Sequence, residues 1–207
     1  MDLQVLVSAV NQEMAGMAER MNLETEAIII NQCEGFAYQE YTHKGSRIRC
    51  YSLAERGVGL SRNSGLMRAD ARFCLFGDED IVYDQGYGGQ IEEAFTTYPQ
   101  ADLLLFNIRV CPARKTYWNE RVKTIRWYNY GRYPAYSIAA RTASLHRANV
   151  SFSLLFGGGA KYSNGEDSLF LRDCLRAGLK IIALPIVIGE ERERESTWFH
   201  GYTEKFF

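Results

Sequence analysis

The acidic triplet Asp78-Glu79-Asp80 is the stretch of the sequence best suited to metal chemistry. It follows an apolar run at residues 73–76 that reads as a buried strand, with Gly77 between the two. In an extended chain alternate side chains share a face, so Asp78 and Asp80 should converge on one object while Glu79 points away. Two converging carboxylates suit a hard divalent cation, Mn²⁺ or Mg²⁺, whose remaining ligands a diphosphate would supply.

Two other interpretations of the triplet stay open at the level of the motif. It fits a solvated acidic turn after a strand. It also fits the D-x-D motif of haloacid-dehalogenase-type phosphatases, in which Asp78 would be the nucleophile and Asp80 the general acid and base. That motif usually opens its fold, whereas at least three strands are predicted before residue 72, and Gly77 fits it less well.

A cationic motif precedes the acids by one predicted strand. Arg62 and Asn63 lie near the start of a predicted helix, where a cation and free backbone amides suit an anion or a nucleobase edge. The alternative is a capped helix on the surface. Gly57 and Gly59 resemble half of a dinucleotide fingerprint, but Arg62 stands where its third small residue should be, which argues against a Rossmann dehydrogenase.

A second carboxylate pair, Glu166-Asp167, opens a predicted helix behind a glycine run at residues 157–159. Negative charge at a helix N-terminus is favourable, so the pair also fits an ordinary, well-capped helix. A carboxylate held there could instead accept a proton from an acceptor hydroxyl. We expect the glycine run to form a flexible loop that closes over a ligand.

The elements that must position these groups alternate between strand and helix. Strands are predicted at residues 3–10, 27–32, 46–53, 72–76, 102–108 and 180–188, and helices within 11–24, 60–69, about 88–98 and 166–177. This alternation predicts an α/β domain with a mainly parallel sheet. Ser8, Asn31 and Asp78 each end a predicted strand, so they should face one crevice at the carboxyl edge of the sheet.

Composition excludes several classes of protein. The 207 residues allow one domain with a sizeable core, and a formal net charge of −1 argues against bulk affinity for nucleic acid. The five cysteines are scattered and form no C-x-x-C, as in reduced cytosolic proteins. With no leader peptide and no apolar run of ~20 residues, the expected location is the cytoplasm.

Residues 109–147 differ from the rest of the chain. They hold nine Lys or Arg against the single acid Glu120, interleaved with Tyr and Trp residues. Three interpretations remain open: an ordinary connection whose arginines pair with acids elsewhere, a single-stranded nucleic-acid or polyanion-binding module, or a surface that binds a sugar-containing acceptor. In the third, aromatic rings stack on sugars and arginines hold a lipid-linked diphosphate or contact an anionic membrane.

Three of these motifs, in this order, resemble the family 2 glycosyltransferases. The residues are Arg62-Asn63-Ser64-Gly65, then Asp78-Glu79-Asp80, then Gly165-Glu166-Asp167 followed by "AGLKIIALP". The resemblance covers nearly the whole chain. It implies a single GT-A domain over 1–207, an α/β fold with a mainly parallel central sheet flanked by helices. Residues 1–108 would form the nucleotide-sugar-binding half, and 109–207 would bind the acceptor and supply the catalytic base.

The resemblance also implies roles for single residues in a metal-dependent, inverting transfer. Asp80 would bind the metal, with Asp78 contacting the metal or the ribose, and His200 is a further candidate ligand. The expected cofactor is Mn²⁺ or Mg²⁺, which neutralises charge on the leaving diphosphate.

Donor and acceptor roles follow in the same way. Arg62 would lie near the nucleobase, while Ser8 and Asn31 would line the nucleoside pocket. In the catalytic pair Glu166-Asp167, Asp167 would be the general base that deprotonates the acceptor hydroxyl.

The expected partners are a nucleotide-diphosphate sugar, preferably a UDP-sugar, and a saccharide or lipid-linked acceptor in surface polysaccharide or glycolipid synthesis. Peripheral association with the inner membrane face is expected, and nucleic acid is not. The chain departs from the family where an Asp-Asp pair is usual, because Asn31-Gln32 stands there. An amide pair can donate and accept hydrogen bonds, so it could still read uracil.

Overall fold

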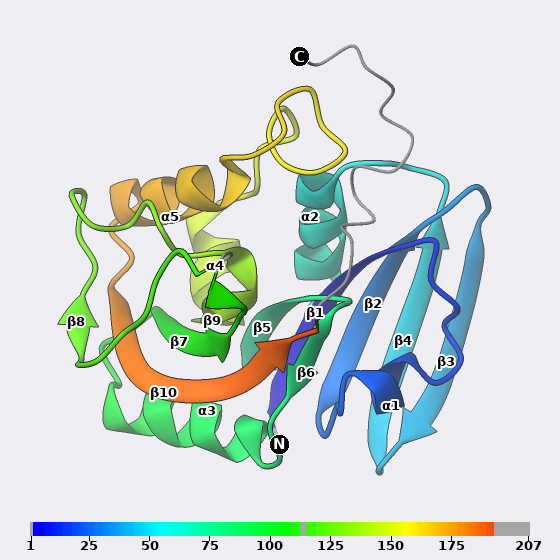
Figure 1. The fold of residues 1–207 in the computed structure, drawn as a ribbon, viewed down its shortest axis with the longest axis horizontal. Helices are drawn as coiled ribbons and strands as arrows, with labels where there is room; N and C mark the ends of the chain where they lie inside the picture. The colour runs from blue at the N-terminus through cyan, green and yellow to red at the C-terminus, as the bar shows by residue number, and fades with distance from the viewer. Residues whose placement is uncertain (1, 113–114, 193–207) are drawn as a thin grey trace.

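The computed structural model describes residues 2–112 and 115–192, which form a single sheet covered by helices on both faces (Figure 1). The sheet has the strand order β3-β4-β2-β1-β5-β9-β7-β10-β6, and β8 pairs with β10 outside this path. The strands are β1 Leu3–Val10, β2 Glu26–Gln32, β3 Ala37–His43, β4 Ser46–Leu53, β5 Phe73–Asp78, β6 Ile81–Tyr83, β7 Leu103–Arg109, β8 Lys123–Thr124, β9 Ile138–Arg141 and β10 Ile181–Glu191.

Six of the strands in the described residues run in one direction, which confirms the predicted mainly parallel sheet. Parallel pairing joins β4 to β2, β2 to β1, β1 to β5, and β7 to β10. The short strand β9 lies between β5 and β7 and is antiparallel to both, so β7 and β10 keep the direction of β5. The outer strands β3 and β6 are antiparallel to their neighbours.

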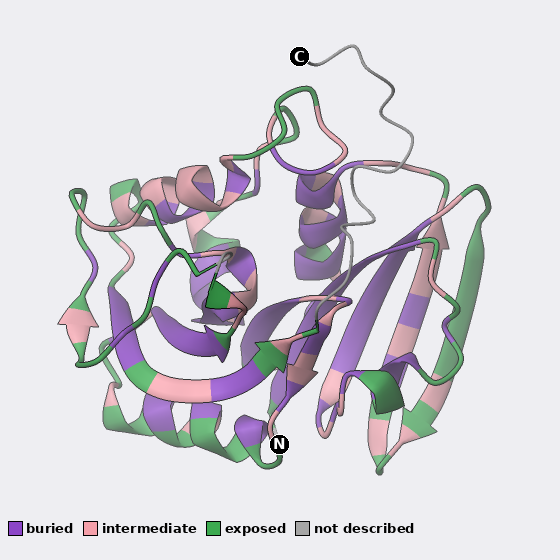
Figure 2. Cartoon of the chain, in the orientation of Figure 1, coloured by how far each residue is buried: buried purple, intermediate pink, exposed green. Residues whose placement is uncertain are grey.

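The helices divide into two layers with separate apolar cores. Helices α1 Met17–Arg20 and α3 Tyr87–Thr97 cover one face, while α2 Val58–Arg68, α4 Thr142–Ala148 and α5 Glu166–Arg176 cover the other. Met17 and Phe95 belong to the first core, and Leu66, Leu145 and Phe170 belong to the second. Strand β1 is buried along its whole length because it is covered on both faces (Figure 2).

The predicted bounds of β1 and β4 are confirmed, whereas β3, β6, β8, β9 and α4 were not predicted. β3 is an exposed edge strand with several polar residues, so it lacks the alternation of a half-buried strand. β9 has four residues, two of them alanine, and is too short to show a period. β5 runs through Gly77 to Asp78, so the strand carries its terminal carboxylate directly into the site. Within the described ranges, no helix has both the length and the apolar content needed to cross a bilayer.

Candidate active site

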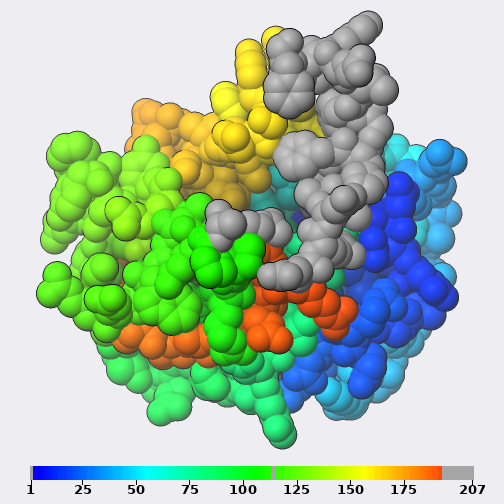
Figure 3. All heavy atoms as spheres, viewed as in Figure 1, coloured from blue at the N-terminus to red at the C-terminus, as the bar shows by residue number. Residues whose placement is uncertain are grey.

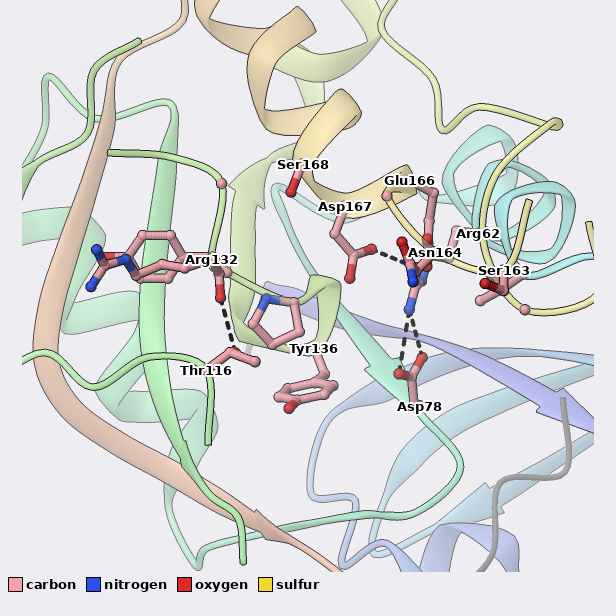
Figure 4. A pocket seen from close by; sticks show the side chains of 16 residues that line it. Arg62, Asp78, Thr116, Arg132, Tyr136, Ser163, Asn164, Glu166, Asp167 and Ser168 are labelled. Carbon is pink, nitrogen blue, oxygen red and sulfur yellow. Dashed lines mark hydrogen bonds and ion pairs between the residues drawn. The ribbon is translucent and has the colours of Figure 1, made fainter. Parts of the chain in front are cut away.

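A pocket of about 570 Å³ opens at the carboxyl edge of the sheet. One side is formed by Arg62 of α2 and Asp78 of β5, and a second side by the start of α5 and the residues just before it. The third side comes from residues 109–147, the segment rich in basic and aromatic residues, which contributes Thr116 and Tyr136 (Figure 4). The pocket therefore joins the two predicted carboxylate sites and part of the predicted acceptor side.

The strand ends meet at this edge as predicted. In the parallel pairing of β1, Ser8 lies opposite Asp78 on β5, and Ala9 lies opposite Asn31 on β2. Ser8 and Asn31 are both buried. Among the described residues that line the pocket, however, Asp78 is present and Ser8, Asn31 and Asp80 are not. The donor-binding roles of Ser8 and Asn31 stay predictions.

Arg62 lies at the centre of three carboxylates. Its Nη1 donates to Oδ1 of Asp167 at 2.7 Å and to Oε1 of Glu166 at 3.0 Å, and its Nη2 donates to Oδ1 of Asp78 at 3.1 Å. The Arg62 side chain is only 4% exposed, and its carboxylate partners expose 11% to 22%. Figure 4 shows Asp78 and Asp167 on different sides of the guanidinium. One buried cation therefore connects the D-x-D motif to the start of α5.

Aromatic packing supports this arginine. Its guanidinium carbon lies 5.3 Å from the ring centroid of Phe152, which stacks on Phe170 at 4.0 Å. Asn63 holds Phe152 in place, because its side-chain amide donates to the Phe152 carbonyl and accepts from the Phe152 amide. Burial lowers the pKa of Arg62, but Asp167, Asp78 and Glu166 raise it by more, so the side chain stays charged.

The protonation of Asp167 is set by opposing effects. Burial raises the pKa of the Asp167 carboxyl, Arg62 lowers it, and the charges of Glu166 and Asp78 raise it again, giving a value of about 7. A carboxylate with a pKa near neutrality is suited to accept a proton from a hydroxyl and release it again. This property is consistent with a general base and also occurs in structural ion-pair networks.

The acidic triplet alternates as predicted for its first two members. Asp78 points to Arg62, whereas Glu79 is buried and its Oε2 accepts a hydrogen bond from the Val10 amide at 2.7 Å. Glu79 thereby joins the ends of β1 and β5. Asp80 is partly buried, and its backbone carbonyl accepts from the Arg192 amide at 2.8 Å.

The amide pair Asn31-Gln32 is engaged with backbone groups. Asn31 accepts from the Gln12 amide and donates to the Gln12 carbonyl, both at 3.0 Å. Gln32 is fully buried. Its side chain donates to the Gly57 carbonyl and accepts from the Gly57 amide, just before α2. Gln32 also lines a second hollow, of about 500 Å³, beside Glu55 and Arg56. The amide pair thus holds the loops that frame this edge of the sheet.

The position of α2 corrects the prediction for Arg62. The helix begins at Val58, so Arg62 lies in its second turn and not beside free amides. The Val58 amide donates to the Gly158 carbonyl at 2.8 Å. A Cβ on Gly59 would lie 2.2 Å from the Ser153 carbonyl oxygen, so only glycine allows this approach.

The glycine run at residues 157–159 packs closely against α2 and the start of α5, and its closure over a ligand stays a prediction. Gly157 is buried at a φ of 101°, and a Cβ there would lie 2.5 Å from Val58 and 2.7 Å from the Glu166 carboxyl carbon. The glycines therefore let α2 and the start of α5 approach closely, which brings Arg62 and Glu166 together.

The excess negative charge of the pocket is the feature that suits a divalent cation. Three carboxylates face the one guanidinium of Arg62, so two negative charges remain when all are ionised. Among residues 2–112 and 115–192, no group of three or more His, Cys, Asp or Glu forms a ready-made metal cage. A cation held by Asp78 and Asp80 would therefore need oxygens from a bound diphosphate. The candidate ligand His200 lies outside the described residues.

The sequence did not predict the ion pairs that Arg62 makes with three carboxylates, nor part of the pocket wall. Arg62 was predicted to lie near a nucleobase, and nothing local indicates that it reaches acids 16 and 105 residues away. Ser163 and Asn164 also line the pocket, and the only available signal was their position just before Glu166. Thr116 and Tyr136 fall within the segment that was assigned to the acceptor side.

Together the sheet, its two helical layers and the pocket define the fold of a GT-A-type glycosyltransferase domain. The chain superimposes on residues 1–349 of TarS from S. aureus in complex with UDP-GlcNAc, with a TM-score of 0.69 and 19% identity. That match covers 98% of this chain and 62% of the TarS chain.

Two further TarS structures agree with this match. The TarS 1–349 complex with UDP gives a TM-score of 0.64 at 19% identity, over 92% of this chain and 60% of that one. A further S. aureus TarS structure gives a TM-score of 0.65 at 17% identity, over 93% of this chain and 37% of that one. The chain thus spans less than two thirds of these proteins. No protein-family model matches the sequence, and the curated proteins gave no significant match.

Proposed function

We propose that this chain binds a nucleotide-diphosphate sugar and transfers the sugar to an acceptor hydroxyl. The observation that carries the proposal is the pocket in which Asp78 and Asp167 face one another across Arg62 at the carboxyl edge of the sheet. Ligands of open α/β sheets bind at this edge. Support also comes from the fold, which the TarS complexes with UDP-GlcNAc and UDP share.

In this proposal the two sides of the pocket have separate tasks. The diphosphate lies against the end of β5, where Asp78 and Asp80 would hold Mn²⁺ or Mg²⁺; the bound cation would supply positive charge that offsets the charge of the leaving diphosphate. The acceptor enters between Asp167 and the wall formed by Thr116 and Tyr136. Asp167 removes the proton of its hydroxyl, and attack opposite the leaving diphosphate inverts the anomeric centre.

Arg62 prepares the site for this chemistry before any ligand arrives. It fixes the Asp167 carboxylate at 2.7 Å and keeps Asp78 within reach of the pocket. A uridine nucleotide is the preferred donor class, because UDP and UDP-GlcNAc are the ligands of the similar structures. The hollow beside Gln32, Glu55 and Arg56 is the proposed place for its base.

The first test is a thermal-shift panel of UDP, UDP-sugars and other nucleotides, each with Mn²⁺, Mg²⁺ or EDTA. A ligand that binds only the folded state at 100 times its dissociation constant should stabilise the protein by about 2.7 kcal/mol. We expect a metal-dependent shift for uridine nucleotides that Asp80→Ala removes. Equal shifts in EDTA would contradict the metal, and no shift with any nucleotide would contradict the donor site.

The phosphatase alternative is tested with the same preparations. It requires Asp78 to be free as a nucleophile, whereas both Asp78 oxygens lie within 3.3 Å of Arg62 Nη2. Hydrolysis of phosphomonoesters by the protein, abolished in Asp78→Asn, would favour that alternative over sugar transfer.

A further inference from the structure

The segment of residues 115–132 combines exposed aromatic rings with positive charge. Trp127 is 80% exposed, Tyr128 is 65% exposed and Val122 is 45% exposed. The segment runs from the pocket wall at Thr116, outward past β8, and back to the wall at Gly131 and Arg132. Its atoms stand out along the left edge in Figure 3. We call residues 115–132 the basic-aromatic loop.

Buried polar contacts hold the basic-aromatic loop against the sheet. Asn119 exchanges two hydrogen bonds of 2.9 Å with the Asn107 side chain of β7. Tyr117 donates to the Phe106 carbonyl at 2.8 Å, and Tyr133 donates to Asn119 at 2.9 Å. Ile125 is buried, and β8 pairs with β10. The exposed rings are therefore presented from a fixed framework, which lowers the entropy lost on binding.

The basic-aromatic loop is strongly positively charged. It carries five basic residues and the single acid Glu120, a net charge of +4 by 5 − 1, on a chain whose total is −1. Arg121, Arg126 and Arg132 are exposed. Trp127 and Tyr128 pack edge to face at 5.5 Å between centroids and expose most of their surface. Contiguous exposed apolar patches, especially those rimmed by polar residues, mark sites where a protein meets a ligand, a partner or a membrane.

We infer that the basic-aromatic loop docks the protein on the surface of an anionic lipid bilayer. Trp and Tyr side chains favour the interface between headgroups and acyl chains, because each ring has an apolar body and a polar edge. Lysine and arginine beside them are attracted to anionic headgroups. The loop is positively charged and the membrane is negatively charged. This complementarity favours an anionic bilayer over a neutral surface as the binding partner.

Docking at this loop would also orient the pocket. Thr116 and Arg132 belong both to the loop and to the pocket wall, so the side of the pocket opposite Arg62 would lie next to the membrane. A hydroxyl carried on a lipid headgroup could then reach Asp167 from that side. The binding step itself does not depend on sugar transfer, so it can be tested separately.

The test is co-sedimentation of the full chain with phosphatidylcholine vesicles and with vesicles that also contain phosphatidylglycerol. We expect binding only to the anionic vesicles, with a fall at high salt. Each basic residue near such a surface contributes about fivefold to partitioning, so Arg121→Gln with Arg126→Gln should weaken binding about 25-fold. Trp127→Ser with Tyr128→Ser should also release the protein.

The matched control is Phe36→Ser, which removes a ring that is 79% exposed in the connection between β2 and β3. It should bind vesicles like the wild type. In addition, tryptophan emission should shift to the blue on anionic vesicles, and Trp127→Phe should remove most of that shift while retaining binding. No binding, equal binding to both vesicles, or an unchanged Trp127→Ser/Tyr128→Ser variant would overturn the inference. Binding of polyphosphate or single-stranded RNA without vesicle binding, or dimerisation lost in that variant, would assign the loop to another occupant.

Discussion

Arg62 and Asp167 are joined by a hydrogen bond of 2.7 Å between Nη1 and Oδ1, although they lie 105 residues apart in the sequence. The other terminal nitrogen of Arg62 holds Asp78 at 3.1 Å. The proposed base and the proposed donor-side carboxylate are therefore connected through one guanidinium. Any ligand that draws Asp78 away from Arg62 changes the electrostatic field on Asp167.

Arg62→Met should destabilise the fold by about 3–5 kcal/mol, because it leaves buried carboxylates without their cation. Chemical denaturation at neutral pH measures this loss. It should shrink at acidic pH, where the carboxylates are protonated. The exposed Arg147→Met in α4 is the matched control and should stay within about 0.5 kcal/mol of the wild type. A loss that is the same at every pH would contradict the electrostatic explanation.

Asp167→Asn should abolish transfer and leave donor binding intact. The amide keeps the size and position of the side chain but cannot accept the hydroxyl proton, so a rate loss of about 10²–10⁴-fold is expected. Donor binding is followed by calorimetry and transfer by product formation. Asp173→Asn is the control, since Asp173 lies on the same helix in a half-exposed pair with Arg172. If Asp167→Asn transfers at the wild-type rate, the base is another group.

The rate of transfer should rise with pH through about 7, because Asp167 must lose its proton to act as a base and its pKa is about 7. The steady-state rate at saturating donor, measured from pH 5 to 9, gives this profile. A flat profile over this range would exclude Asp167 as the titrating group.

The raised pKa of Asp167 also affects stability. The transfer rate should rise with pH, whereas the stability of the folded protein should fall. Since the unfolded value is about 3.9, the folded protein holds more protons between about pH 4 and 7, so the Asp167 contribution to the free energy of unfolding falls as pH rises through this window. Denaturant melts of the wild type and of Asp167→Asn measure the difference. In Asp167→Asn the free energy of unfolding should fall less between about pH 4 and 7 than in the wild type. If the free energy of unfolding depends on pH in the same way in both proteins, the raised pKa is contradicted.

Gly59→Ala should destabilise the protein by about 1–3 kcal/mol, because the new Cβ would meet the Ser153 carbonyl oxygen at 2.2 Å and push α2 away from residues 152–153. Gly89→Ala in α3 is the control, since a Cβ there meets nothing within 4 Å. In a helix interior this control should be neutral or stabilising by up to about 1 kcal/mol. Thermal melts of the two variants compare them directly, and equal effects would show that the close approach is unimportant.

Most of the fold could be read from local pattern. The buried strand β1, the partly buried strand β4 and the helix α5 carry a clear periodicity or a run of β-branched residues, and their predicted positions agree with the structure. β9 could not be predicted in this way. Its four residues are specified by the neighbours β5 and β7, between which they insert, and not by their own sequence.

The site was predictable as separate motifs but not as an assembly. The sequence indicated carboxylates at Asp78 and Asp167, because each stands at the end or the start of a periodic element. The ionic contact that unites them depends on the close approach of the start of α2 to the start of α5, which Gly157 permits. The spacing of residues along the sequence does not reveal such contacts between distant parts of the chain.

The strand order also bears on how the chain could be divided. β7 belongs to residues 1–108 for all but its last residue, yet both of its neighbours, β9 and β10, come from the second part of the chain. A fragment of residues 1–108 would leave both edges of β7 and one edge of β5 open to pairing with other molecules. The two parts are therefore interleaved in one sheet, and neither part holds a complete sheet of its own.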